Sequence, residues 1–476
     1  MKLSEILKEL KYEGTAPEGE IALITDDSRK VSPGCVFVCI RGKRFDGHSA
    51  AGQAIAAGAV CVVAERDTGA APRLLVKNSR EAYALLCAAF YGFPARKLTL
   101  VGVTGTNGKT TTSTLLKKIF DHAGRKTGLV GTNVNMADQQ EFPAALTTPD
   151  PWELHALFAK MREAGCTHCF MEVSSQALDQ MRLAGLEFKA AIFTNLTQDH
   201  LDYHGTLEAY TQAKRMLFSQ CETAVVNMDD EAGPQMLENS GAAPVTYSLS
   251  RDDADYTAKN VSLRADGVSY ELVGRGIIGR VKFGVPGAFS VYNSLAAACA
   301  ALELGLELPQ VLQALERSNG VTGRMEVVQT GTPYTVVIDY AHSPDSLENA
   351  LRALRETTTG RLITVFGCGG DRDKAKRPVM GRIAAERSDV VVVTSDNPRS
   401  EDPDAIIADI LEGIPKNRAH VLVQPDRKLA VAQALKKARE GDVVLLAGKG
   451  QETYQILATG KIHMDEREIV RELLEM

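Results

Sequence analysis

The run Thr104-Gly-Thr-Asn-Gly-Lys-Thr110 holds the residues whose types and spacing best suit phosphate chemistry. Glycines at 105 and 108 let backbone N–H groups close around phosphate oxygens, and Lys109 can reach the outer phosphates. Thr110 can offer its hydroxyl to Mg²⁺. The general pattern of such loops has glycine where this chain has Val103, so the loop is a variant. The pattern predicts a nucleoside triphosphate site, and the alternative is a glycine turn that happens to precede Lys-Thr.

The elements around this loop must position it. An apolar run over residues 98–103 predicts a strand that enters the loop, and a helix-forming segment follows. A second apolar strand, predicted over 168–175, carries one carboxylate, Glu172, near its C-terminal end, where ligands of open parallel sheets gather. Because a lone carboxylate is costly to bury unless it is paired or holds a metal, Glu172 is predicted to bind Mg²⁺. A third strand at 190–196 leads into Asp199-His-Leu-Asp-Tyr-His204, which indicates either a metal or phosphate contact or a solvated loop.

Length and composition are typical of a cytoplasmic protein of several domains. The chain has 476 residues, 44% of them hydrophobic and 24% charged, and a net charge of −6. That charge gives no electrostatic reason for nucleic acid or membrane as a partner, and the longest apolar stretch, residues 54–64, is too short to span a bilayer. Nine scattered cysteines do not resemble a disulfide framework, and Cys169 of the one C-x-x-C is expected in a strand core. We expect a monomer that binds neither nucleic acid nor membrane.

Strands that alternate with helical patterns predict an α/β fold of three domains. Residues 1–97 alternate short strands with polar turns, and residues 98–325 hold the phosphate loop of a P-loop ATPase-type domain. Residues 326–476 repeat strand and helix in the rhythm of a Rossmann-like, mostly parallel sheet. In the first domain, loops carry Ser28, Arg29 and His48, which suit an anionic nucleotide or serve ordinary turns.

Three unusual loops follow strands of the third domain. They are Gly367-Cys-Gly-Gly-Asp-Arg-Asp373, Ser395-Asp-Asn-Pro-Arg-Ser400 and Gly448-Lys-Gly-Gln-Glu452. The carboxyl ends of parallel strands meet at one edge of a sheet, so these loops predict a second ligand site.

Several ordered motifs, which together cover essentially the whole chain, resemble the Mur ligase family. Beyond the phosphate loop they are Asp27-Ser-Arg29, Thr147-Thr-Pro149, Met171-Glu-Val-Ser-Ser175, Asp199 to His204, Tyr210 to Phe218, Asp339-Tyr-Ala-His342 and Asp396-Asn-Pro-Arg399. The resemblance implies an amide ligase that uses ATP and Mg²⁺. ATP would phosphorylate the D-glutamyl carboxylate of UDP-MurNAc-L-Ala-D-Glu, and the amine of meso-diaminopimelate would then displace phosphate. The first domain would bind the UDP substrate, the second ATP, and the third the amino acid.

The resemblance also implies roles for individual residues. The ATP contacts would be Gly105, Thr106, Asn107, Gly108, Lys109, Thr110, Thr111, Asn293, Arg324 and Asp339. The UDP-substrate contacts would be Ser28, Thr147, Thr148, Ser174, Gln180 and Arg182. The diaminopimelate contacts would be Arg372, Asp396, Asn397, Arg399, Gly448 and Glu452. Catalysis would use Lys109, His200 and Lys214, and the metal ligands would be Thr110, Glu172, His200 and Lys214 as a carbamate. A carbamate converts the lysine cation into a carboxylate-like group, which electrostatics favours beside Mg²⁺.

Arg399 decides which amino acid is expected. Its planar guanidinium suits the distal carboxylate of diaminopimelate, which lysine lacks. The sequence therefore predicts diaminopimelate, and the nearest alternatives are a lysine-adding Mur ligase or a folylpolyglutamate synthetase. A different class, a P-loop switch or nucleotide sensor, would leave Lys214 and the third-domain loops without a role.

Overall fold

The structure is a computed structural model that describes residues 1–42, 45–197, 201–416 and 418–475. The chain divides into two compact units: unit 1 comprises residues 1–256 with 296–306, and unit 2 comprises residues 257–295 with 307–476. The predicted domain boundaries at residues 97 and 325 stay predictions.

Unit 1 opens with a small parallel sheet of order β1-β2-β3-β4. Its strands are β1 (Leu23–Thr25), β2 (Cys35–Val38), β3 (Cys61–Ala64) and β4 (Arg73–Leu75). Its helices are α1 (Leu3–Ile6), α2 (Ala51–Ala56) and α3 (Ser79–Phe90). All of β2 and β3 is buried, which explains why both strands are continuous apolar runs.

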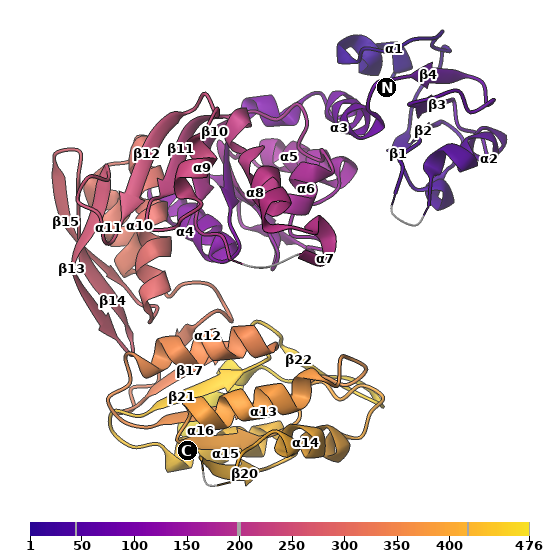
Figure 1. Ribbon diagram of the computed structural model, residues 1–476. Helices are drawn as coiled ribbons and strands as arrows, with labels where there is room; N and C mark the ends of the chain where they lie inside the picture. Colours follow the sequence, from indigo (N-terminus) through magenta and orange to yellow (C-terminus); the bar gives the residue numbers. More distant parts are fainter. Residues whose placement is uncertain (43–44, 198–200, 417, 476) are drawn as a thin grey trace. The chain divides into compact units, whose positions relative to one another are not determined.

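The rest of unit 1 is a larger sheet with helices, in which strands run in the order β12-β11-β10-β5-β9-β6-β7-β8. Figure 1 labels the neighbouring strands β12, β11 and β10 of this sheet. The strands are β5 (Thr99–Thr104), β6 (Thr127–Val130), β7 (Asn135–Ala137), β8 (Gln140–Phe142), β9 (His168–Glu172), β10 (Phe188–Phe193), β11 (Cys221–Asn227) and β12 (Ala243–Ser248). The helices are α4 (Lys109–His122), α5 (Pro151–Glu163), α6 (Ser175–Asp179), α7 (Leu201–His204), α8 (Leu207–Arg215) and α9 (Gly233–Leu237). Pairing is parallel from β12 to β6, so the carboxyl ends of β5, β9 and β10 lie side by side.

Strand β9 ends earlier than the apolar pattern predicts. The predicted strand runs to residue 175, but the observed strand stops at Glu172 and α6 begins at Ser175. The reason is local: the Ser174 side chain accepts a hydrogen bond from the backbone N–H of Ala177 and caps the helix.

Unit 2 contains the antiparallel strands β14 (Gly267–Gly274) and β15 (Ile277–Phe283) and a sheet of order β16-β17-β21-β18-β19-β20. The first strand, β16 (Glu326–Val328), is antiparallel to its neighbour. The parallel strands are β17 (Thr335–Asp339), β18 (Leu362–Phe366), β19 (Val390–Val393), β20 (His420–Val423) and β21 (Val443–Ala447). The remaining elements of unit 2 are α11 (Leu308–Glu316), α12 (Pro344–Arg355), α13 (Lys376–Arg387), α14 (Pro403–Glu412), α15 (Arg427–Lys437), β22 (Tyr454–Leu457), β23 (Gly460–His463) and α16 (Glu466–Leu474). The residues of β13 (Tyr256–Arg264) and α10 (Ala288–Glu303) are divided between the two units.

The unit 2 sheet is buried on both faces, and alternate strand residues build the core on one of them. Val336, Ile338, Val444 and Leu446 point to the face that packs against α15 and α16, as the period of two along a strand requires. The strands β17, β21, β18 and β19 are neighbours, so the loops that follow them meet at one sheet edge.

The cysteines are free thiols, and Cys169 is fully buried in β9, as expected from the sequence. Among the described residues, no helix combines the length and the apolar character that crossing a membrane requires.

His155 in α5 gives a pH-dependent prediction. Both ring nitrogens are buried and have no hydrogen-bond partner among the residues that the structure describes, and burial lowers the pKa of His155 from 6.5 to about 4. As the pH falls below 6.5, the unfolded chain takes up this proton first, so stability is lost between pH 6.5 and about 4. For His155→Leu we expect the loss of unfolding free energy between pH 7 and pH 5 to be smaller by about 2 kcal/mol. Denaturant titrations at the two pH values test this, and equal losses in both proteins would contradict it.

Candidate active site

The phosphate loop joins β5 to α4 and is held by the end of β10. The Asn107 N–H donates to the Asn195 side chain at 2.9 Å, and the Thr194 hydroxyl donates to the Asn107 carbonyl at 2.6 Å. A Cβ on Gly105, whose φ is +150°, would lie 1.9 Å from the Thr194 hydroxyl oxygen, so this position requires glycine. Thr194 and Asn195 thus hold the phosphate loop in place, a role that nothing in their local sequence indicates.

The cation and the amides of the loop are placed for an anion. Lys109 donates to the carbonyls of Gly105 and Thr106, at 2.9 and 2.8 Å, and its ammonium therefore lies over the loop. Helix α4 begins at Lys109 and has no described side-chain cap, so its first N–H groups face the loop. The residues from Gly105 to Thr111, all predicted to contact ATP, therefore belong to the loop and the first turn of α4.

Glu172 lies at the carboxyl end of β9, beside the loop, and its side chain is buried. Its carboxylate accepts hydrogen bonds from the Thr110 hydroxyl at 2.9 Å and from the N–H and hydroxyl of Thr132 at 2.8 and 3.0 Å. All these donors are neutral. Gly131 provides the space, because a Cβ there would lie 2.5 Å from a Glu172 oxygen.

These residues fit Mg²⁺. A buried carboxylate and a hydroxyl side by side are the oxygen ligands that this ion prefers. Across the described part of the chain, no three His, Cys, Asp or Glu side chains gather as a metal site. The predicted ligand His200 lies outside the described residues, as does Asp199.

Lys214 in α8 reaches the same loop. Its side chain is buried, donates to the Gly105 carbonyl at 2.9 Å and lies 4.4 Å from the centre of the Tyr210 ring. The structure thus brings Lys214 together with Lys109 at one carbonyl group.

Five of the six predicted UDP-substrate contacts form one group beside Glu172. The Thr148 hydroxyl donates to the Glu172 carbonyl and accepts from the Ser174 N–H, and Thr147 lies 3.0 Å from Thr132. Arg182 donates to the Thr148 carbonyl and to the Gln180 side chain, each at 2.8 Å. Ser28 is exposed in the turn after β1.

His48 and Arg29, which the sequence offers for an anionic nucleotide or for ordinary turns, both have protein partners. His48 is buried, with Nδ1 2.7 Å from the Asp46 carboxylate and Nε2 accepting from the Glu65 N–H at 3.1 Å. Both ring nitrogens are therefore used within the fold. The Arg29 guanidinium pairs with the neighbouring Asp27 at 2.9 Å, which lowers the pKa of that carboxyl.

The other three predicted ATP contacts belong to unit 2. The Asp339 carboxylate, at the end of β17, accepts from the N–H groups of Met325 and Ala341, and its burial raises its pKa. The Arg324 guanidinium lies 4.9 Å from the centre of the Tyr340 ring, so these two residues are close together. Asn293 is buried in α10.

All six predicted diaminopimelate contacts line one pocket at the sheet edge of unit 2. The pocket is bounded by Tyr340, His342, Gly369, Arg372, Asp373, Lys376, Asp396, Asn397, Arg399, Gly448 and Glu452. The residues come from the loops after β17, β18, β19 and β21, as the parallel topology predicts.

Among the described residues, two guanidiniums of this pocket, those of Arg372 and Arg399, form no ion pair. Arg399 donates to the carbonyls of Gly370 at 2.9 Å and Asn397 at 3.4 Å. The backbone of Arg399 is left-handed, with φ of 53°, and its N–H donates to the Ile456 carbonyl. A residue in this strained conformation persists only where its surroundings fix it, as is common at binding sites.

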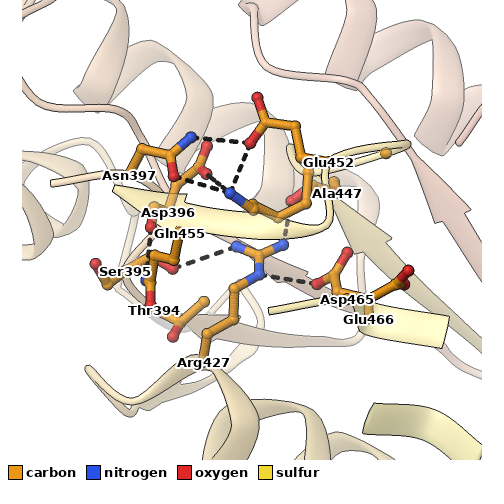
Figure 2. Close-up of polar contacts among 12 residues, drawn as sticks. Thr394, Ser395, Asp396, Asn397, Arg427, Ala447, Glu452, Gln455, Asp465 and Glu466 are labelled. Carbon is orange, nitrogen blue, oxygen red and sulfur yellow. Dashed lines mark hydrogen bonds and ion pairs between the residues drawn. The ribbon is translucent and has the colours of Figure 1, made fainter. Parts of the chain in front are cut away.

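A buried ion pair lies beneath the pocket. Arg427 and Glu466 are 2.8 Å apart and each is at most 2% exposed. Figure 2 shows Arg427 between Ser395, Ala447 and Glu466, and it donates to the Ser395 and Ala447 carbonyls at 3.4 and 2.7 Å. These two carbonyls belong to the residues directly before the pocket residues Asp396 and Gly448. Neither charge stands out in the sequence, because each lies in an ordinary helical pattern.

Comparison with known proteins agrees with this arrangement. Residues 20–91 match the description "Mur ligase family, catalytic domain", residues 103–301 "Mur ligase middle domain", and residues 323–450 "Mur ligase, glutamate ligase domain". A relative from Clostridium acetobutylicum is 43% identical over 482 residues, which cover 100% of this chain and 99% of the relative. A relative from Parabacteroides distasonis is 46% identical over 464 residues, which cover 95% of this chain and 94% of the relative. The chain belongs to the Mur ligase family.

Both relatives are named UDP-N-acetylmuramoyl-L-alanyl-D-glutamate–2,6-diaminopimelate ligase. A solved structure with the same name is 32% identical, covers 100% of this chain and 99% of its own, and has a TM-score of 0.77. The MurF ligase of Thermotoga maritima, solved in complex with ADP, shares the fold at 21% identity and a TM-score of 0.57, covering 95% of this chain and 97% of its own. The predicted α/β fold of three domains is confirmed.

Proposed function

We propose that this protein joins meso-diaminopimelate to UDP-MurNAc-L-Ala-D-Glu at the expense of ATP and forms the UDP-MurNAc-tripeptide of peptidoglycan synthesis. The observation that carries the proposal is the unit 2 pocket, in which all six residues expected to contact diaminopimelate come together. Full-length relatives named for this reaction support it. A cytoplasmic location goes with this proposal.

The reaction has two chemical steps. The D-glutamyl carboxylate attacks the γ-phosphorus of ATP, which forms an acyl phosphate and releases ADP. The amine of diaminopimelate then attacks the acyl carbon, loses a proton, and expels phosphate from a tetrahedral intermediate. Negative charge accumulates on the transferred phosphoryl group, so Lys109 and the first N–H groups of α4 would contribute by stabilising it.

Thr110 and Glu172 would hold Mg²⁺ at the phosphate loop. When bound, this ion supplies positive charge to the phosphate oxygens. The role of Glu172 in the protein itself is to keep a buried anion beside the loop, fixed by Thr110 and Thr132.

Lys214 is proposed to carry a carbamate. Its amine is already inside the loop, 2.9 Å from the Gly105 carbonyl, and a carbamate would keep one N–H for this bond while adding negative charge. With ¹³C-labelled bicarbonate, we expect a carbamate carbon signal in the NMR spectrum of the wild type that is missing in Lys214→Met. An identical spectrum for both proteins would contradict the modification.

The pocket favours an amino acid with two carboxylates. Neither Arg372 nor Arg399 forms an ion pair in the described structure, and a bound carboxylate would accept two hydrogen bonds from the Arg399 guanidinium. Bound lysine would give that guanidinium no carboxylate to pair with. A site built for a polar group discriminates against an analogue that lacks it by about 10⁴-fold in kcat/KM.

The experiment that tests the function measures phosphate release and product mass with ATP, Mg²⁺ and UDP-MurNAc-L-Ala-D-Glu. One reaction receives meso-diaminopimelate and the other L-lysine. We expect turnover with diaminopimelate alone. Turnover with lysine would retain the ligase and refute the selectivity, and no turnover in either reaction would refute the ligase.

A further inference from the structure

Lys449 lies beneath the amino-acid pocket and is not among the residues predicted to contact diaminopimelate. Lys449 follows Gly448 in the loop after β21, and its side chain is 0% exposed. Its ammonium donates to the Glu452 carboxylate at 2.6 Å and to the Asn397 amide oxygen at 2.9 Å, and it lies 3.6 Å from the Asp396 carboxylate. All three partners line the pocket.

The bonds of Lys449 fix the orientation of the Asn397 amide. The amide oxygen accepts from Lys449 and from the Ile456 N–H, each at 2.9 Å. The amide nitrogen donates to Glu452 at 2.9 Å, and Figure 2 shows the two side chains pointing toward one another. A flipped amide would place its donor against two donors, so Lys449 helps to set which pocket atoms accept and which donate.

The same ammonium sets the charge of the pocket. Among the lining side chains Arg372, Lys376 and Arg399 are cationic, and Asp373, Asp396 and Glu452 are acidic, so their formal charges balance. When Lys449, which lies behind the lining, is counted as well, the site has one positive charge in excess. Diaminopimelate with one amine deprotonated for attack carries two carboxylates and one ammonium, a net charge of minus one that complements the site. Without Lys449, the Asp396 and Glu452 carboxylates would lose the ammonium that lies 3.6 and 2.6 Å from them.

We propose that Lys449 is a positioning residue of the amino-acid pocket, which orients Asn397 and Glu452 for a dicarboxylic amino acid and compensates the paired acidic groups. The inference rests on the proposed function. Lys449 acts through its neighbours, since it lies outside the pocket lining.

The test compares Lys449→Met with the wild type in steady-state kinetics. We expect the KM for meso-diaminopimelate to rise roughly 10- to 100-fold, with the KM values for ATP and the UDP substrate within about twofold of the wild type. If the methionine variant does not fold, Lys449→Gln takes its place. The glutamine amide can donate to only some of the three partners of Lys449. We therefore expect the KM for diaminopimelate to rise at least about threefold.

Lys117→Met is the matched control. Lys117 is also buried, at 4% exposure, and pairs with Asp121 at 2.7 Å within α4. This variant should lose stability, measured as Tm, but keep the KM for diaminopimelate. An unchanged KM in folded Lys449→Met, or KM values that rise for all three substrates alike, would overturn the proposal and leave the ligase intact. A wild type that does not turn over diaminopimelate would overturn both.

Discussion

Replacing Arg399 by methionine is expected to lower kcat/KM for meso-diaminopimelate by roughly 10³-fold, because a carboxylate of the bound substrate loses a charge-assisted partner. Arg399→Lys should lose less, since lysine keeps the charge but not the planar fork. Both variants keep a side chain at the left-handed position with φ of 53°, so the backbone strain is the same as in the wild type. Steady-state kinetics with varied diaminopimelate at saturating ATP measures the effect.

Arg382→Met is the matched control for Arg399. Arg382 lies on α13 in the same unit, its side chain is 53% exposed, and it is 3.7 Å from Glu386. An exposed pair of this kind contributes little, so kcat/KM should stay within about twofold. If Arg399→Met retains the wild-type kcat/KM, the proposed carboxylate contact is wrong.

Glu172→Gln should lower kcat roughly 10²- to 10³-fold at a fixed Mg²⁺ concentration and shift activation to higher Mg²⁺, because a neutral amide is a poor ligand for this ion. The fold should tolerate the change. An amide oxygen can still accept from the Thr132 N–H, and the Thr110 and Thr132 hydroxyls can turn to accept from the new NH₂ group. Phosphate release titrated with Mg²⁺ tests the prediction.

Glu163→Gln, an exposed change at the end of α5, provides the comparison for Glu172. Its Mg²⁺ titration should match the wild type. A Glu172→Gln protein with the wild-type Mg²⁺ dependence would show that this carboxylate holds no metal and that its burial serves the fold alone.

The pocket in unit 2 could be predicted because its residues follow from strand order and polarity. The predicted loops at 367–373 and 448–452 directly follow β18 and β21, and parallel strands bring the loops after them to one edge. Glu172 could be predicted for a related reason: a single charge near the end of an apolar strand is a strong signal. In these cases the information is local.

Contacts between distant segments could not be predicted. Residues 454–463 form the β22–β23 hairpin, and its Gln455 donates to the carbonyl of Asp396, 59 residues earlier in the chain, at 2.6 Å. Lys449 looks like any lysine of a glycine-rich loop until Asn397 and Glu452 are placed beside it. The sequence leaves His48 open between a ligand contact and an ordinary turn, because its partners Asp46 and Glu65 are assigned only by the fold.

The Arg427–Glu466 pair has a consequence for how the pocket moves. One guanidinium joins the segments before Asp396 and Gly448 to α16, and breaking it would leave buried charge without a partner. These segments are therefore expected to open and close as one cooperative unit rather than fray separately. The rigidity that amino-acid selection needs is in this way shared with the last helix, which contributes no residue to the pocket lining.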